Sequence, residues 1–247
     1  EEHSEIEAVL HFAAFKAVGE STEKPLPYYR NNVAGSIALF EAMETAGVHN
    51  LVFSSSCTVY GEPREVPVTE GHPVGEVSSP YGRTKYIMEE MLRDHCAANK
   101  LWNVAILRYF NPVGAHESGL IGEDPRGVPN NLMPFVAQVA IGKIDKLCVY
   151  GGDYPTADGT GVRDYIHVMD LAEGHAAALE KLSVGFDVVN LGTGTPVSVR
   201  EMVTAYEDAC GKDIPFEIAP RRAGDLSEFW SDCSKAKQKL SWEAVRS

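Results

Sequence analysis

The sequence predicts an α/β protein, built as a doubly wound parallel sheet followed by a smaller mixed α/β domain. Short apolar runs at 8–12, 51–53 and 104–107 are typical of buried strands. Longer helical patterns at 28–46 and 80–99 lie between these runs. Strands and helices that alternate in this way predict a parallel sheet with helices on both faces.

The pattern loosens after Pro112, where a loop rich in glycine and proline covers 114–129. Ser198 and Glu201 then form a capping-box pattern before a helix that ends near Cys210. The other elements expected here are helices at 131–141 and 168–182 and strands at 147–150, 188–191 and 215–219. We therefore divide the chain into two domains, 1–112 and 113–247.

Composition excludes several classes of function. The net charge is −13, from 22 basic and 35 acidic residues, and a surface this acidic repels nucleic acid. No apolar run approaches the roughly 20 residues that span a bilayer, and the acidic start of the chain is unlike a signal peptide. Five widely spaced cysteines indicate reduced thiols, which suits the cytoplasm. The histidines lack metal-ligand spacing; His167 and His175, the nearest pair, are expected to cap or pack, and no metal is predicted.

Tyr81 and Lys85 are the centre of the functional hypothesis. Ser79 suits the cap and Pro80 the first turn of the helix at 80–99. Tyr81 and Lys85 are then at i and i+4, on one helix face. A free tyrosine titrates near ~10, and a neighbouring ammonium favours the phenolate that a general base requires. The same spacing also occurs on ordinary surface helices, so the pair alone does not decide the function.

The serines at 54–56 make the pattern more specific. They follow an apolar strand, and ligands bind at the carboxyl ends of strands in a doubly wound sheet. A serine hydroxyl there can bond a substrate oxygen near the tyrosine. The alternative is a polar turn capped by serines.

Together these segments resemble the extended short-chain dehydrogenase/reductase family, and within it the UDP-galactose 4-epimerases. The resemblance rests on Ser54–Gly61 (SSSCTVYG) and Pro80–Lys85 (PYGRTK), with further segments at 11–21, 107–112, 130–134, 158–168, 190–194 and 221–225. It implies a Rossmann-like NAD-binding domain at 1–112 and a UDP-sugar-binding domain at 113–247. It also implies an NAD-dependent isomerase that interconverts UDP-galactose and UDP-glucose through a 4-keto sugar.

The resemblance also assigns roles to single residues. Tyr81 would be the catalytic base, Lys85 its activator and a ligand of the nicotinamide ribose, and Ser56 the partner of the sugar 4-hydroxyl. The other NAD-contacting positions would be Phe12, Ala13, Lys16, Asn31, Ser54 and Tyr109. The UDP-sugar site would comprise Ser56, Asn111, Asn131, Leu132, Arg163, Arg222, Asp225 and Phe229.

Side-chain chemistry is compatible with these roles but does not require them. Guanidinium groups bind phosphate oxygens bidentately, so Arg163 and Arg222 suit a diphosphate. Without the motifs, a solvated surface role is as plausible for either arginine and for Lys16. Asn111 and Asn131 are also typical of turns and helix caps.

Two further expectations follow from the resemblance. The helices at 28–46 and 80–99 would pair across a homodimer axis, with Ile37, Phe40, Met88 and Leu92 as candidate contacts, although core packing is equally plausible for each. A bulky Phe229 in the sugar pocket would make UDP-N-acetylglucosamine a poor substrate.

The sequence also departs from the family pattern, because it contains no G-x-x-G-x-x-G phosphate loop. We expect it to lack the first strand–helix units of an NAD-binding domain. The 247 residues alone are then expected to be poorly soluble, to purify without NAD and to show no epimerisation.

Two other functions remain open. A nucleotide-sugar dehydratase would carry an Asp-Glu pair where this chain has Cys57 and Thr58; reductases and decarboxylases of the superfamily belong to the same alternative. The second is a non-catalytic fragment that only binds a UDP-sugar.

Overall fold

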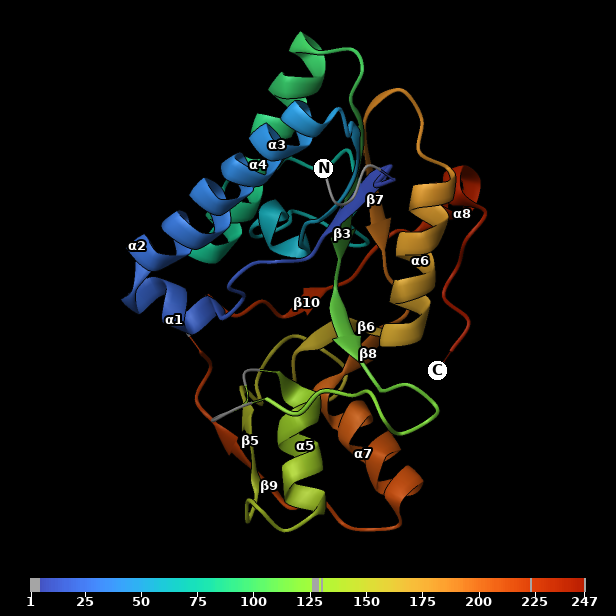
Figure 1. The fold of residues 1–247 in the computed structure, drawn as a ribbon. Coiled ribbons are helices and arrows are strands. Elements are labelled where there is room, and N and C mark those ends of the chain that lie inside the picture. The colour runs from blue at the N-terminus through green and yellow to red at the C-terminus, as the bar shows by residue number, and fades with distance from the viewer. Residues whose placement is uncertain (1–4, 126–128, 130, 223, 247) are drawn as a thin grey trace.

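The computed structural model describes residues 5–125, 129, 131–222 and 224–246 (Figure 1). Its main sheet contains β1 (Ala8–His11), β2 (Asn50–Ser54), β3 (Asn103–Tyr109) and β7 (Gly185–Leu191). The four strands are parallel and lie in the order β1-β2-β3-β7. The predicted α/β class with a parallel sheet is confirmed.

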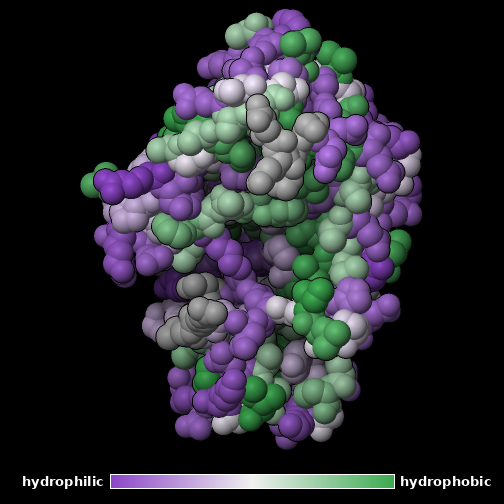
Figure 2. Space-filling view, viewed as in Figure 1, coloured by the Kyte–Doolittle hydropathy of each residue, from purple (hydrophilic) through white to green (hydrophobic). Residues whose placement is uncertain are grey.

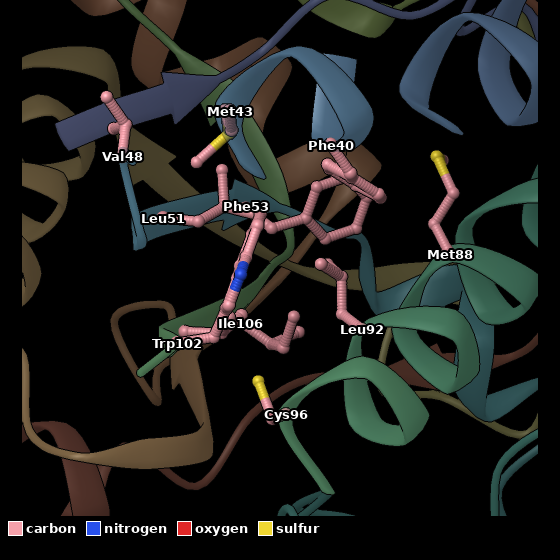
Figure 3. Close-up of a cluster of buried hydrophobic side chains, with 11 residues drawn as sticks. Phe40, Met43, Val48, Leu51, Phe53, Met88, Leu92, Cys96, Trp102 and Ile106 are labelled. Carbon is pink, nitrogen blue, oxygen red and sulfur yellow. The ribbon is translucent and has the colours of Figure 1, made fainter. Parts of the chain in front are cut away.

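Side chains of one sheet face pack under α3 (Gly35–Ala46) and α4 (Pro80–Ala98). Successive strand residues point to opposite faces, so Leu51 and Phe53 turn to this side. Figure 3 shows them against Phe40 of α3 and Leu92 of α4. Trp102 closes one end of this cluster, with its indole N–H donated to Glu44 at 2.5 Å.

The opposite face packs under α6 (Val168–Glu180) and α8 (Ser234–Leu240). Val52 and Leu107, the alternate residues of the same strands, contact this second cluster together with Trp242. Helices therefore cover both faces, as in the ribbon of Figure 1. The sheet is doubly wound, as the sequence predicted.

The smaller part of the molecule is mixed α/β. Its two sheets contain β4 (Asn111–Val113), β6 (Val162–His167), β8 (Pro196–Ser198) and β10 (Glu228–Phe229), and β5 (Leu147–Tyr150) paired with β9 (Phe216–Ala219). β8 is antiparallel to β6, and the other pairs are parallel. Helices α5 (Leu132–Ala140) and α7 (Val199–Cys210) pack on β5. The capping box of Ser198 and Glu201 is present.

The helix expected at 28–46 is helical throughout, but part of it is π-helical. A short α1 (Val18–Glu23) and α2 (Pro25–Tyr28) precede a π-helical segment, Tyr29–Ala34, which continues into α3. The buried Asn32 lies in that segment. Its amide accepts from Phe15 N at 2.8 Å and donates to Thr84 at 3.0 Å, which ties this helix to α4.

The chain does not divide at residue 112 into two spatial units. β7 lies beside β3 in the main sheet, and α6 and α8 cover its second face, so residues 168–191 and 234–242 pack with the first half of the chain. The sequence pattern did not indicate that the chain returns to the main sheet as β7, because the pairing of strands about 80 residues apart leaves no local signal.

Three of the four candidate dimer contacts lie in the core. Phe40, Met88 and Leu92 are buried in the cluster between the sheet, α3 and α4, whereas Ile37 is 40% exposed. The core interpretation therefore holds for these three residues, because the apolar face of each helix covers the sheet.

β1 is an edge strand, and apolar side chains on and beyond it reach the surface. Leu10, Phe12 and Phe15 are 37%, 56% and 47% exposed. Such an edge favours association with other chains. Low solubility of the isolated 247 residues stays a prediction. Among the described residues, no helix combines the length and apolar character needed to cross a membrane.

Candidate active site

A cavity of about 930 Å³ lies between the main sheet and the smaller part of the molecule. Figure 2 shows a recess between these two parts. The carboxyl ends of β2 and β3 open into it, where a doubly wound sheet binds ligands. Twelve of the residues assigned by resemblance line its wall: Phe12, Lys16, Ser56, Tyr81, Lys85, Tyr109, Asn111, Asn131, Leu132, Arg163, Arg222 and Asp225.

Tyr81 and Lys85 are carried by the first turns of α4. Ser79 caps this helix by accepting from Gly82 N at 3.1 Å, and Pro80 occupies its first turn, as predicted. Lys85 is 3% exposed, and its Nζ donates to the Ser54 carbonyl at 2.6 Å. Burial lowers the pKa of Lys85 to about 8, and the nearby Glu89 carboxylate opposes that shift. The ammonium is therefore poised to lose its proton close to physiological pH.

The Tyr81 phenol lies in the same cavity, close to Ser56. Burial raises the pKa of Tyr81, the neighbouring Tyr109 adds to the rise, and a hydrogen bond with Ser56 opposes it. The Ser56 hydroxyl also accepts from Thr58 N at 3.3 Å, which fixes the start of a short 3₁₀ helix, Cys57–Tyr60. A phenol in this setting stays protonated at neutral pH unless positive charge stabilises the phenolate.

The three serines point in different directions, because Ser54 and Ser55 continue the alternation of β2, whereas Ser56 begins the following turn as the cap of the 3₁₀ helix. Ser54 Oγ is 3.0 Å from Nε2 of His175, on α6. Ser55 donates to Glu89 on α4 at 2.5 Å. Only Ser56 lines the cavity, so it alone of the three is placed to meet a substrate oxygen.

A buried ion pair supports this turn from the α4 side. Glu89 and Arg108 are 0% and 2% exposed, and Arg108 Nη2 lies 2.5 Å from Glu89. The guanidinium also stacks over Tyr60, 4.8 Å from the ring centre. Burial works against the charge on Arg108, but the bonds to Glu89 outweigh it and raise the pKa of the guanidinium.

Two arginines on the cavity wall share one carboxylate. Arg163, on β6, bonds Asp225 at 2.5 Å, and Arg222 bonds the same group at 3.2 Å. Asp225 thus holds both guanidinium groups while each keeps further donors. Tyr165 is on the same face of β6 as Arg163, and burial raises its pKa to about 12. The strand period of two would have revealed Tyr165, had β6 been predicted.

Glu123 is another cavity residue that the sequence did not single out. It accepts from Asn131 at 3.0 Å and lies 3.5 Å from Lys16 Nζ. It comes from the expected glycine-rich loop, and neither its spacing nor its neighbours in sequence indicate a site.

Four assigned residues lie off the cavity wall: Ala13, Asn31, Ser54 and Phe229. Ala13 and Asn31 are exposed, and Asn31 donates to Asn32 at 3.0 Å. Ser54 is 1% exposed and lies behind Lys85, whose Nζ donates to the Ser54 carbonyl. Phe229 is 6% exposed and packs behind Phe110, with 5.2 Å between ring centres. Phe110 lines the cavity, so Phe229 can affect the shape of the cavity only through the Phe110 ring.

His167 and His175 cap and pack, as expected. His167 caps α6 by accepting from Met169 N at 3.1 Å, and His175 is 2% exposed. In the described part of the chain, no three His, Cys, Asp or Glu side chains gather in a way that would hold a metal ion.

The buried Lys85 gives the protein a defined pH response. The pKa of Lys85 falls from 10.5 to about 8 on folding, so the folded state binds this proton less tightly than the unfolded state. The lysine therefore destabilises the folded protein fully below pH 8, and this destabilisation disappears as the pH rises towards 10.5. We expect the free energy of unfolding of the wild type, relative to Lys85→Met, to increase by roughly 2–3 kcal/mol across this window. Urea unfolding of both proteins at pH 7 and pH 10 measures it, and an equal difference at the two pH values contradicts the assignment.

Known proteins resemble this chain over nearly its whole length. A family model described as GDP-mannose 4,6 dehydratase matches residues 2–247. UDP-glucose 4-epimerase of Bacillus subtilis (strain 168) is 60% identical over 245 residues, which are 98% of this chain and 72% of that protein. The human UDP-glucose 4-epimerase is 58% identical over 240 residues, 96% of this chain and 69% of that protein.

Solved structures of UDP-glucose 4-epimerases also superpose closely on this chain. UDP-glucose 4-epimerase from Bifidobacterium longum, in complex with NAD+ and UDP, superposes with a TM-score of 0.94 at 52% identity, covering 98% of this chain and 73% of that one. The enzyme from Stenotrophomonas maltophila, with bound NAD and formylated UDP-arabinopyranose, gives 0.96 at 50% identity, covering 100% and 73%.

Fold and cavity define an enzyme of the extended short-chain dehydrogenase/reductase class, with a tyrosine–lysine pair at the end of a doubly wound sheet. The chain belongs to the family described by the dehydratase model and, within it, to the UDP-glucose 4-epimerases, which are isomerases.

Proposed function

We propose that this protein interconverts UDP-galactose and UDP-glucose by inverting C4 of the hexose through a 4-keto sugar, with NAD as cofactor. One observation carries the proposal: a single cavity holds Ser56, Tyr81 and Lys85 together with the arginine pair Arg163 and Arg222. This combination suits a nucleotide sugar, because the guanidinium groups can hold its diphosphate while the other three side chains act on the hexose.

Each residue has a definite task in this reaction. Tyr81 accepts the proton of the sugar 4-hydroxyl and later returns it. Lys85 favours the phenolate through its charge, and Ser56 donates to the 4-oxygen and so aligns it with Tyr81. Arg163 and Arg222 hold the diphosphate while the 4-keto sugar turns over, so that either face can be reduced.

The residues present fit the nicotinamide end of NAD. Phe12 and Tyr109 offer aromatic surfaces on the cavity wall, and Lys85 offers ammonium donors beside them. When bound, NAD would accept the hydride from C4 and give it back, so that no net oxidation occurs. The same reaction class is named for the relatives that were solved with NAD.

The dehydratase alternative lacks its acid. Cys57 and Thr58 occupy the positions where a dehydratase would carry an Asp-Glu pair. Burial raises the pKa of the Cys57 thiol to about 12, which makes it a poor acid for expelling water at neutral pH. The non-catalytic alternative is opposed by the intact group of Ser56, Tyr81 and Lys85 in one cavity.

A product analysis tests the proposal. The intact protein is incubated with NAD and UDP-galactose, and the nucleotide sugars are separated by chromatography. We expect UDP-glucose to accumulate to an equilibrium mixture without net formation of NADH. A 4-keto-6-deoxy product would support the dehydratase instead, and binding of UDP-galactose without turnover would support the non-catalytic alternative.

The arginine assignment can be tested against a neighbouring control. Arg222→Ala should weaken UDP binding about tenfold, which corresponds to ~1.4 kcal/mol, because one charged contact to the diphosphate is lost. Arg221→Ala is the control, since Arg221 lies off the cavity wall and bonds Asp153 at 2.7 Å. Calorimetric titration with UDP measures both, and equal affinities for the two variants count against a diphosphate at Arg222.

The assembly, the compartment and the sugar preference also stay predictions. We infer a homodimer in the cytoplasm, with Ile37 as the one exposed side chain among the four candidate contacts. Poor use of UDP-N-acetylglucosamine is still expected, but Phe229 would act through the Phe110 ring in front of it.

A further inference from the structure

His175 is a buried, titratable side chain with two hydrogen-bond partners and no role in the reaction described above. Its Nδ1 lies 2.8 Å from the Leu171 carbonyl, and its Nε2 lies 3.0 Å from Ser54 Oγ. A carbonyl only accepts, so Nδ1 carries the proton. Burial lowers the pKa of His175, which keeps the ring neutral. Nε2 is therefore an acceptor, and the Ser54 hydroxyl donates to it.

Ser54 links this histidine to the cavity. Its carbonyl accepts from Lys85 Nζ at 2.6 Å, and its hydroxyl lies near the Tyr109 phenol. His175 also supports the wall directly. The Phe12 ring is 4.7 Å from the imidazole, centre to centre, and the Tyr109 ring is 5.7 Å away.

We propose that His175 is a positioning residue of the active site, which acts through Ser54 to fix Lys85 and through ring contacts to hold Phe12 and Tyr109. The proposal rests on the function proposed above. It assigns a task to a serine that the sequence placed in the site but that does not reach the cavity wall.

The location of His175 supports a specific role over simple packing. It lies on the buried face of α6, between Leu171 and Ala178, which pack in the apolar cluster under the sheet. An apolar residue at 175 would continue that face without the cost of burying an imidazole. It would also leave the buried Ser54 hydroxyl without its acceptor, which is unfavourable for a polar group removed from water.

Substitutions separate positioning from packing. His175→Phe keeps an aromatic ring but removes both bonds, whereas His175→Gln reaches as far as Nε2 and can still accept from Ser54. In the intact protein we expect His175→Phe to lower kcat for UDP-galactose about tenfold with little change in KM, because Lys85 would shift relative to Tyr81 in this variant. Gln should restore kcat to within about threefold. Ser54→Ala should resemble His175→Phe, and the double variant should be no worse than either single one, because both act along one chain of bonds.

A second readout does not depend on turnover. In protein labelled with ¹³C at lysine Cε, the Lys85 signal should titrate near pH 8. We expect its midpoint to move by about half a unit in His175→Phe and to stay in place in His175→Gln. Nitrogen NMR should show a protonated Nδ1 and an Nε2 signal that changes in Ser54→Ala.

The outcomes are distinct. Equal kcat in Phe and Gln variants of similar thermal stability, an unchanged Lys85 midpoint, or a proton on Nε2 would overturn the proposal. If the unmodified protein fails to turn over UDP-galactose, the proposed function fails, and the Lys85 titration still decides whether His175 positions this lysine.

Discussion

Replacing Tyr81 by phenylalanine is expected to lower kcat for UDP-galactose by about 10²- to 10⁴-fold, the range that general acid–base catalysis contributes. The phenol lines the cavity near Ser56 and is the base in the proposed reaction, and phenylalanine keeps its ring and nearly its volume. Affinity for UDP should change little, because the proposed contacts to the diphosphate come from Arg163 and Arg222 and remain in the variant. Steady-state kinetics and calorimetry with UDP measure the two effects separately.

Tyr86→Phe is the matched control for this experiment. Tyr86 is on the same helix, five residues further on, but it lies off the cavity wall and packs beside Gly75. Its variant should retain the wild-type kcat. A Tyr81→Phe protein that turns over UDP-galactose at the rate of the Tyr86→Phe protein would refute Tyr81 as the base.

The sequence predicted the helix start that carries Tyr81 and Lys85, because the signals for a helix start are local. Ser79, Pro80, Tyr81 and Lys85 lie within one helix start, where capping preferences and the i, i+4 spacing are reliable. The predicted strand at 51–53 is followed directly by the serines at 54–56, and this local sequence also predicted that Ser56 lies at a strand end. Residues that meet only through tertiary packing, such as Glu123 and His175, left no such signal.

The fold shows the same limit. The strands of the first half are continuous apolar runs, which buried parallel strands require. β6 was missed because Arg163 and Asp164 interrupt its pattern, and Asp164 is buried only because it accepts from Thr193 and Ser231. β10 has two residues, too few for any period. Asn31 and Asn32 are adjacent and alike in sequence, and only packing shows that Asn32 is the one directed inward.

Breaking the buried pair of Glu89 and Arg108 is expected to give the largest loss of stability. Each charged group is almost fully removed from water, and its main compensation is the ion pair with the other. Glu89→Met should lower the free energy of unfolding by about 3–5 kcal/mol, because it leaves a buried guanidinium unpaired. It also removes the acceptor of Ser55, so kcat should fall together with stability.

The double variant Glu89→Met/Arg108→Met separates the charge effect from the packing effect. With both charges removed, the loss should be smaller than in either single variant, because no unpaired charge remains. The exposed pair Glu90 and Arg93, one residue along α4 at 3.3 Å, provides the control, and Glu90→Gln should cost less than ~1 kcal/mol. Urea unfolding of the wild type, Glu89→Met, Arg108→Met, the double variant and Glu90→Gln measures these differences. A double variant that is as unstable as the sum of the single variants would show that the two side chains contribute independently, and the turn at Ser54–Ser56 would then not depend on their pairing.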